Sequence, residues 1–198
     1  MRMTRTFPLI ALAAALTCAC GTPPKDHFYT LIDAAQPSPA TGGNGPSVQI
    51  TAITLPEAVD RNELVLRNGP YSVAVLDTRR WAESLKSAIP RVLANDLGPM
   101  LDSTAVSTAD DNTGVHAKYQ LRLDITRFDT ALGGTEAIDA AWIIHPASGK
   151  ADRAGRVSLR VAAHGGDYDE AVAAQVQALA QLSAEIAKQI KDLEKTGN

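Results

Sequence analysis

The side chains that could bind a metal ion or act in catalysis are few and lie far apart in the sequence. The histidines form no H-E-x-x-H motif and no pair four residues apart; they are His27, His116, His145 and His164. Because a metal centre needs several such ligands together, this spacing predicts solvent-exposed or edge-strand histidines rather than a site assembled by folding. Asp110-Asp111-Asn112 resembles a fragment of a calcium-binding loop but lacks the required downstream Gly and Glu, so a polar turn is predicted there.

No sequence motif of an enzyme active site is present either. The chain has no G-x-S-x-G nucleophile elbow, and the glycines within 34–47 lack both the G-x-G-x-x-G pattern and the Lys and Ser/Thr of a P-loop. Carboxylates for glycoside cleavage meet only in the folded chain, so a cell-wall hydrolase stays open as one alternative. We expect a protein that is not an enzyme and that needs no cofactor.

The two cysteines are best suited to covalent chemistry, and they lie close together at Cys18 and Cys20. A basic start and then about ten apolar residues precede them, which is the pattern of a secretory signal too short to remain in a membrane. Ala19 before Cys20 resembles the bacterial lipobox, in which the thiol takes a diacylglycerol before cleavage and the new amine is then acylated. We predict a cleaved lipoprotein signal peptide over 1–19 and lipidation of Cys20; the alternative is an ordinary signal peptide with incidental cysteines.

The residues after the predicted cut form a lipidated N-terminus and spacer, 20–26. Two or three acyl chains anchor a protein stably, because each buried methylene contributes roughly 0.8 kcal/mol. Gly21 rather than Asp follows the cysteine, which by the usual sorting rule for such lipoproteins points to the outer membrane, with the domain in the periplasm. No apolar stretch reaches the roughly 20 residues of a transmembrane helix.

Composition predicts a single globular domain over 27–195. The chain has 198 residues, of which 45% are hydrophobic and 21% charged, and this length is enough for one core. Since no cysteine follows Cys20, the domain has no disulfide and depends on its core for stability. A formal net charge of -3 leaves no basic surplus to neutralise phosphates, so we expect no nucleic acid partner.

Alternation of apolar and polar residues predicts several strands. The last three are separated by Gly133-Gly134 and by the turn 146–149, which indicates an antiparallel meander. Asn68-Gly69-Pro70 lies between two earlier strands and predicts a hairpin turn. The expected strands are 27–32, 48–52, 63–67, 71–76, 119–126, 138–144 and 157–163.

Two stretches have the apolar spacing of amphipathic helices. The first covers 81–97; Pro90 should bend it, and Gly98-Pro99 should end its regular part. The second begins near Asp167, where Asp167 and Glu170 resemble a capping box, and continues almost to the C-terminus. Because one-sided helices and a one-sided sheet must cover each other, we predict an α+β fold in which two main helices pack on one face of a largely antiparallel sheet.

Two segments carry a family resemblance. Residues 55–67 read L-P-E-A-V-D-R-N-E-L-V-L-R, and residues 80–85 read R-W-A-E-S-L. They are similar to the P-x-x-x-D-R-x-x-[IV]-V segment and the R-W-A-E-x-L helix start of the ABC-type transport auxiliary lipoproteins, the PqiC family. An early F-Y-T-L and an alanine-rich C-terminal helix also match, so the resemblance runs from Cys20 to about Lys191. The chain departs from the family at Asn62-Glu63, commonly Pro-Gln, and at Ser84, commonly Pro.

The resemblance also suggests roles for individual residues. Trp81 and Leu85 are expected in the core of the motif. Arg80 should point outward, where Glu83 or Glu57 could pair with it. The charged residues of the motif are candidates for contact with a partner, namely Asp60, Arg61, Arg67 and Arg80. They could instead be ordinary surface residues, in which case Asp60 and Arg61 would form a local ion pair.

The resemblance implies an outer-membrane lipoprotein that works with a mammalian-cell-entry (MCE) domain protein, PqiB-like, in carrying lipids between membranes. Our hypothesis is therefore a non-enzymatic periplasmic adaptor whose acyl chains on Cys20 hold it at the outer membrane. The sequence also permits a homo-oligomer that would suit a tubular partner. A standalone lipid-binding carrier, whose sheet and helices enclose an acyl chain, is the alternative.

Overall fold

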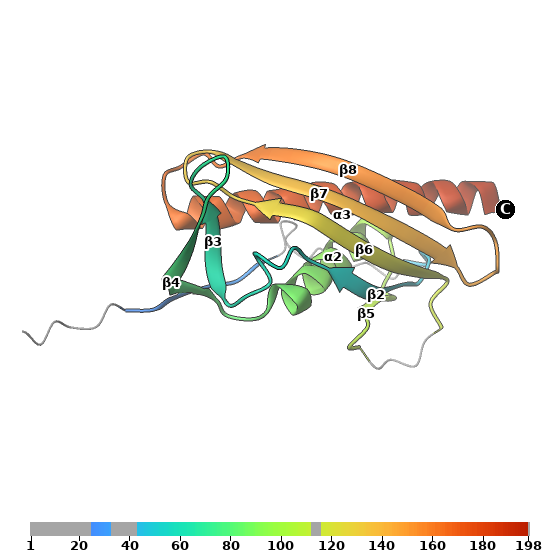
Figure 1. Cartoon of the computed structure of the whole chain (residues 1–198). Helices are drawn as coiled ribbons and strands as arrows, with labels where there is room; N and C mark the ends of the chain where they lie inside the picture. Colours follow the sequence, from blue (N-terminus) through green and yellow to red (C-terminus); the bar gives the residue numbers. More distant parts are fainter. Residues whose placement is uncertain (1–24, 33–42, 112–115, 198) are drawn as a thin grey trace, which may run out of the picture.

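The computed structural model describes residues 25–32, 43–111 and 116–197. The signal peptide, the lipidation of Cys20 and most of the spacer, as predicted above, lie outside these residues. Within them the fold is α+β, as expected: strands form two sheets, and two long helices cover the larger one (Figure 1). No helix among the described residues is both long and apolar enough to cross a bilayer.

The larger sheet has five strands in the order β5-β2-β6-β7-β8. Its antiparallel meander is confirmed, because β6 pairs with β7 and β7 with β8. The sheet is nevertheless mixed: β2 lies parallel to both β5 and β6, since the chain leaves β2 and returns only after long connections. The bounds are β2 Val48–Thr54, β5 Val106–Thr108, β6 Tyr119–Asp129, β7 Thr135–Pro146 and β8 Arg153–Ala162.

A smaller sheet holds β1 (His27–Tyr29), β3 (Glu63–Arg67) and β4 (Val73–Trp81) in the order β1-β4-β3. The expected hairpin around 68–70 is confirmed, because β3 and β4 are antiparallel. β4 continues beyond the expected end at Leu76 to Trp81. The extension occurs because β1 lies parallel to it, with Phe28 opposite Arg80.

The first helix, α2 (Leu85–Leu101), starts later and ends later than the spacing predicts. Trp81 belongs to β4, and the side chain of Ser84 caps the helix by accepting a 3.2 Å hydrogen bond from the Ser87 N–H. Gly98-Pro99 does not end the helix. Asp102 does so in a left-handed conformation (φ 50°), where its N–H bonds back to the carbonyl of Pro99.

The second helix, α3, runs over Tyr168–Gly197 and so continues almost to the C-terminus, as the spacing predicts. Its predicted cap is present, because the Glu170 N–H donates a 2.9 Å hydrogen bond to Oδ1 of Asp167. α3 packs along β7 and β8, and α2 packs against α3, β2 and β5. Both helices therefore cover one face of the larger sheet (Figure 1).

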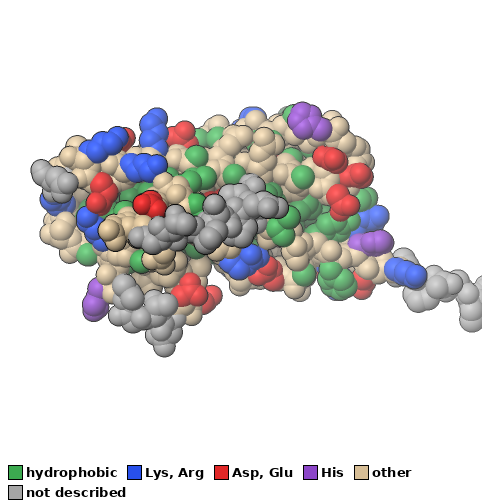
Figure 2. All heavy atoms as spheres, turned by 180° about the vertical axis from the view of Figure 1, so that it is seen from behind, with side chains coloured by type: hydrophobic (Ala, Val, Ile, Leu, Met, Phe, Trp, Pro, Cys, Tyr) green, Lys and Arg blue, Asp and Glu red, His purple; other side chains and the backbone are tan. Residues whose placement is uncertain are grey.

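The core between the helices and the larger sheet is filled by aliphatic side chains. Inward-facing residues of β6 and β7 meet the apolar stripes of both helices. Charged side chains of both signs are interspersed over the surface, as Figure 2 shows for one side of the molecule. The side chains that are completely buried, at 0% exposure, include Ile89, Leu93, Leu121, Ile138, Leu179, Leu182 and Ile186.

Candidate functional site

The two motif segments of the sequence come together at one end of the smaller sheet. Trp81 and Leu85 lie in the core, at 6% and 2% exposure. The Trp81 N–H donates a 2.7 Å hydrogen bond to the carbonyl of Asn62, which places the 60–62 loop beside the end of β4. We call the charged group around this contact the motif end; its members are Asp60, Arg61, Arg80 and Lys86.

Within the motif end, Asp60 and Arg61 do not pair with each other. The carboxylate of Asp60 instead accepts a 2.5 Å hydrogen bond from Nζ of Lys86, at the start of α2. The side chain of Arg61 is exposed and has no hydrogen bond or ion pair with the described residues. Arg61 is thus an exposed cation on a loop that the ion pair between Asp60 and Lys86 connects to α2.

Arg80 also differs from expectation in its partner. Its Nε donates a 3.1 Å hydrogen bond to the backbone carbonyl of Asp77. Glu83, one of the two carboxylates expected to pair with Arg80, instead pairs with Arg91 on α2. Arg80 is half-buried.

Arg67 lies at the opposite end of β3, away from the other candidate contacts. Its Nε donates a 2.9 Å hydrogen bond to Oδ2 of Asp129, which also accepts one of 2.8 Å from Arg127. The hydrogen bond to Asp129 raises the pKa of Arg67. Burial acts to raise the pKa of Asp129, but the two arginines outweigh it and the pKa falls below its ordinary value. Arg67 therefore joins the two sheets.

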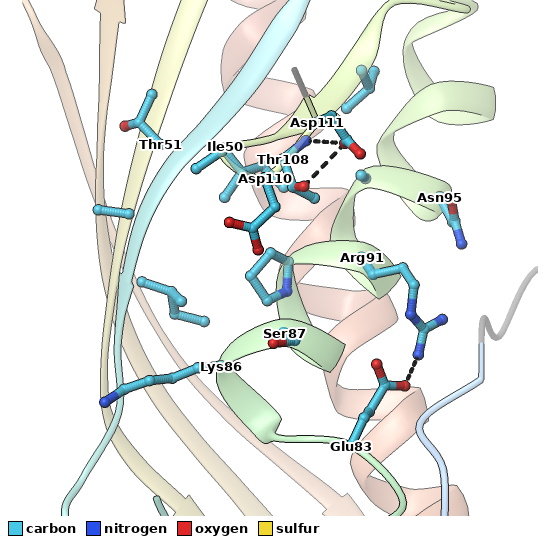
Figure 3. Close-up of a pocket in the computed structure, with 16 residues that line it drawn as sticks. Ile50, Thr51, Glu83, Lys86, Ser87, Arg91, Asn95, Thr108, Asp110 and Asp111 are labelled. Carbon is cyan, nitrogen blue, oxygen red and sulfur yellow. Dashed lines mark hydrogen bonds and ion pairs between the residues drawn. The ribbon is translucent and has the colours of Figure 1, made fainter. Parts of the chain in front are cut away.

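A cleft of about 500 Å³ opens between α2 and the strands β2 and β5 (Figure 3). Its apolar lining includes Ile50, Ile53 and Pro90. In Figure 3, Lys86 extends toward β2, whereas Arg91 and Glu83 pair on the far side of α2. The cleft is lined by charged groups of both signs.

One of the two aspartates that line this cleft, Asp111, is engaged in local hydrogen bonds. Oδ2 of Asp111 accepts hydrogen bonds from the N–H and the hydroxyl of Thr108, at 2.6 and 3.0 Å. This is the polar turn expected for the Asp110-Asp111 segment. Among the described residues no three His, Cys, Asp or Glu side chains are grouped closely enough to hold a metal ion.

Sequence reasoning missed two buried titratable groups, Asp96 on α2 and Glu136 on β7, at 1% and 0% exposure. Oε2 of Glu136 accepts a hydrogen bond from the hydroxyl of Thr130, and its Oε1 has no hydrogen-bond partner among the described residues. Burial raises the pKa of Glu136 well above its ordinary value. The alternation of apolar and polar residues could have indicated this burial for Glu136, because Glu136, Ile138 and Ala140 are two residues apart along one strand and therefore point to the same side.

Comparisons with known proteins agree with this fold. A crystal structure of an uncharacterized protein shares 18% identity, with a TM-score of 0.69 over 84% of this chain and 99% of that one. A Xanthomonas campestris protein of family DUF330 shares 18% identity, with a TM-score of 0.62 over 87% and 99%. At these identities the likeness concerns the fold alone. No curated protein sequence gives a match.

The family assignment rests on a longer match. The family model of the ABC-type transport auxiliary lipoprotein component matches residues 29–187. This range contains both motif segments, the two sheets beyond the first strand and most of α3. The chain therefore belongs to the family of ABC-type transport auxiliary lipoprotein components.

Proposed function

We propose that this lipoprotein is a non-enzymatic adaptor subunit of an MCE-type lipid transport system. Acyl chains on Cys20 hold it at the inner leaflet of the outer membrane, and the motif end docks on an MCE-domain protein. The family's role as a transport auxiliary component supports an adaptor. A tethered adaptor meets its partner at a raised effective concentration, provided that the spacer reaches.

The observation that carries the proposal is that the motif contains both buried apolar residues and an exposed charged one. Its apolar members, Trp81 and Leu85, are buried, whereas Arg61 projects from the same segment without a partner among the described residues. An exposed, unpaired cation on a loop fixed by the Asp60–Lys86 contact contributes little to folding. Such a residue is better explained by contact with an acidic surface of another protein.

Copurification tests this docking. The acylated chain is expressed together with a candidate MCE-domain protein from the same organism, and the complex is recovered through a tag on the chain. We expect Arg61→Glu to reduce recovery of the partner, while Lys188→Glu, a charge reversal on the exposed side of α3, leaves it unchanged. Failure of the unaltered chain to recover an MCE-domain protein would refute the adaptor role.

The anchor has a separate test. Labelled palmitate should be incorporated into the chain, and Cys20→Ser should abolish both the label and fractionation with the outer membrane. The control is Cys18→Ser, which removes the neighbouring thiol and should change neither. Unlabelled chain, or unchanged fractionation of Cys20→Ser, rules out the lipid anchor.

The carrier alternative receives less support from the interior. An enclosed acyl chain would have to occupy the space between the larger sheet and the helices. Leu121, Ile138 and Leu182 fill that space at 0% exposure. Phospholipid recovered in a fixed ratio with chain lacking its anchor would nevertheless favour a carrier over an adaptor.

A further inference from the structure

An apolar groove lies between β1 and the first turns of α3, outside the motif end. Its volume is about 510 Å³, and Val172, Ala173 and Val176 of α3 form one wall. Phe28 and Ile32 form the other, at 63% and 66% exposure. These five residues are called the β1–α3 groove. Among its lining residues Asp169 carries the sole carboxylate.

The exposure of Phe28 and Ile32 follows from strand geometry. Successive side chains of an extended segment point to opposite sides. Leu31 is buried at 1% exposure, and Tyr29 packs against the core, so Phe28 and Ile32 must point outward. β1 is also an edge strand of its sheet. Soluble proteins usually place charged or polar residues at such exposed edges, so two large apolar ones indicate a contact surface.

The position of this groove along the chain identifies what it contacts. Lys25 follows Cys20 by five residues, and five extended residues span at most about 18 Å. Phe28 is only three residues further. Acyl chains on Cys20 would therefore keep the groove within reach of the bilayer surface at all times.

We propose that the β1–α3 groove rests on the membrane, with Phe28 and Ile32 inserted at the boundary between headgroups and acyl chains. This inference rests on the proposed anchoring at Cys20. Apolar and aromatic side chains beside a lipid anchor add a second membrane contact and so orient the domain.

The orientation has a consequence for docking. Phe28 lies opposite Arg80 in the β1–β4 register, so the motif end adjoins the β1–α3 groove. With the groove on the membrane, the adaptor presents Arg61 and Arg80 close to the lipid surface. A partner that delivers or removes lipid is thereby met at the bilayer rather than in the open periplasm.

Fluorescence quenching by the lipid itself tests the contact. The acylated chain carrying Phe28→Trp is reconstituted in vesicles of phosphatidylethanolamine and phosphatidylglycerol, with or without brominated acyl chains. The native Trp81 and Trp142 are buried at 6% and 3% exposure and supply a constant background. We expect brominated lipid to reduce the emission from position 28.

The matched control is Tyr71→Trp. Tyr71 is fully exposed, at 100%, and precedes the opposite end of β4 from the one that pairs with β1. Brominated lipid should leave its emission unchanged. Equal quenching at both positions, or none at position 28 in chain bound to the vesicles, overturns the inference.

Thiol labelling gives a second measurement that needs no fluorescence. The domain after Cys20 has no cysteine, so Phe28→Cys and Tyr71→Cys each introduce one reactive thiol. A membrane-impermeant maleimide should label position 71 in vesicles but position 28 only after detergent is added. If the unaltered chain does not bind the vesicles at all, the proposed anchoring at Cys20 is refuted. If the chain binds but position 28 is labelled without detergent, only the membrane contact of the β1–α3 groove is refuted.

Discussion

The hydroxyl of Ser183 on α3 donates a 3.0 Å hydrogen bond to Oδ2 of Asp96 on α2. Both residues are buried, at 0% and 1% exposure, and they are 87 residues apart in sequence. The hydroxyl also lies 3.0 Å from the carbonyl of Leu179 in its own helix. A polar contact thus fixes how the two helices lie against each other inside an otherwise aliphatic core.

Ser183→Ala should destabilise the protein because it removes a hydrogen bond from a buried carboxylate. Loss of a donor to a buried acceptor costs about 1–3 kcal/mol. We expect that decrease in the free energy of unfolding, measured by urea denaturation. Ser148→Ala, in an exposed turn, is the control; equal stability of the two variants would contradict the prediction.

Gly155→Ala should also destabilise the fold, through a clash with Trp142. A Cβ at position 155 would lie 2.3 Å from Cε2 of that indole. The ring cannot move freely, because its Nε1 donates a 3.0 Å hydrogen bond to Gln189 on α3. Overpacking of this kind costs about 1–3 kcal/mol. Gly166→Ala has nothing within 4 Å of its Cβ and should unfold like the unaltered chain in the same tryptophan-monitored titration.

Glu136→Gln should make stability less sensitive to pH. Burial raises the pKa of Glu136 in the folded state above the ordinary 4.5, and Asp129 raises it further, while Thr130 and two arginines oppose the shift. The folded state thus retains a proton that the unfolded chain loses, so the contribution of Glu136 to stability is fully present below pH 4.5 and is lost as pH rises through the folded pKa. Gln cannot lose a proton. The melting temperature of the variant, relative to the unaltered chain, should rise between pH 4.5 and neutrality; a constant difference would refute the assignment.

Asp129→Asn should have the opposite pH dependence. The hydrogen bonds from Arg67 and Arg127 hold the pKa of Asp129 below 3.8 in the folded state. Its contribution is therefore present above pH 3.8 and is lost as pH falls through the folded pKa. We expect the variant to lose about 1 kcal/mol at neutral pH, a modest value because the arginines are partly exposed. The loss should vanish in strong acid, as measured by chemical denaturation across pH.

The matched control for this ion pair is Asp192→Asn. Asp192 pairs with Lys195 on the exposed surface of α3, at 3.3 Å, and its removal should have almost no effect at any pH. An Asp129→Asn variant as stable as this control would show that Arg67 does not tie the two sheets together.

Local sequence pattern was sufficient to predict the elements in which one side is buried in the same core along the whole length. The alternating rows in β6, β7 and β8 identify both the strands and their buried faces, because side chains in a strand alternate with period two. The turn at 68–70 and the cap at Asp167 depend on residues close in sequence, and both were predicted correctly. Glu136 was missed because the predicted strand began at 138, whereas β7 begins at Thr135 and continues the same alternation through Glu136.

Contacts between distant segments were decided only by the tertiary structure. Trp81 fits the helical spacing of 81–97, yet its backbone is extended because β1 pairs with this end of β4. β2 lies between β5 and β6, parallel to both, and no turn residue could indicate that arrangement. The ion pairs were likewise decided by the tertiary structure: Arg67 pairs with Asp129, 62 residues away in the sequence, and Asp60 pairs with Lys86, 26 residues away. Residue type and periodicity are local properties, whereas strand pairing and ion pairing depend on which surfaces the whole chain brings together.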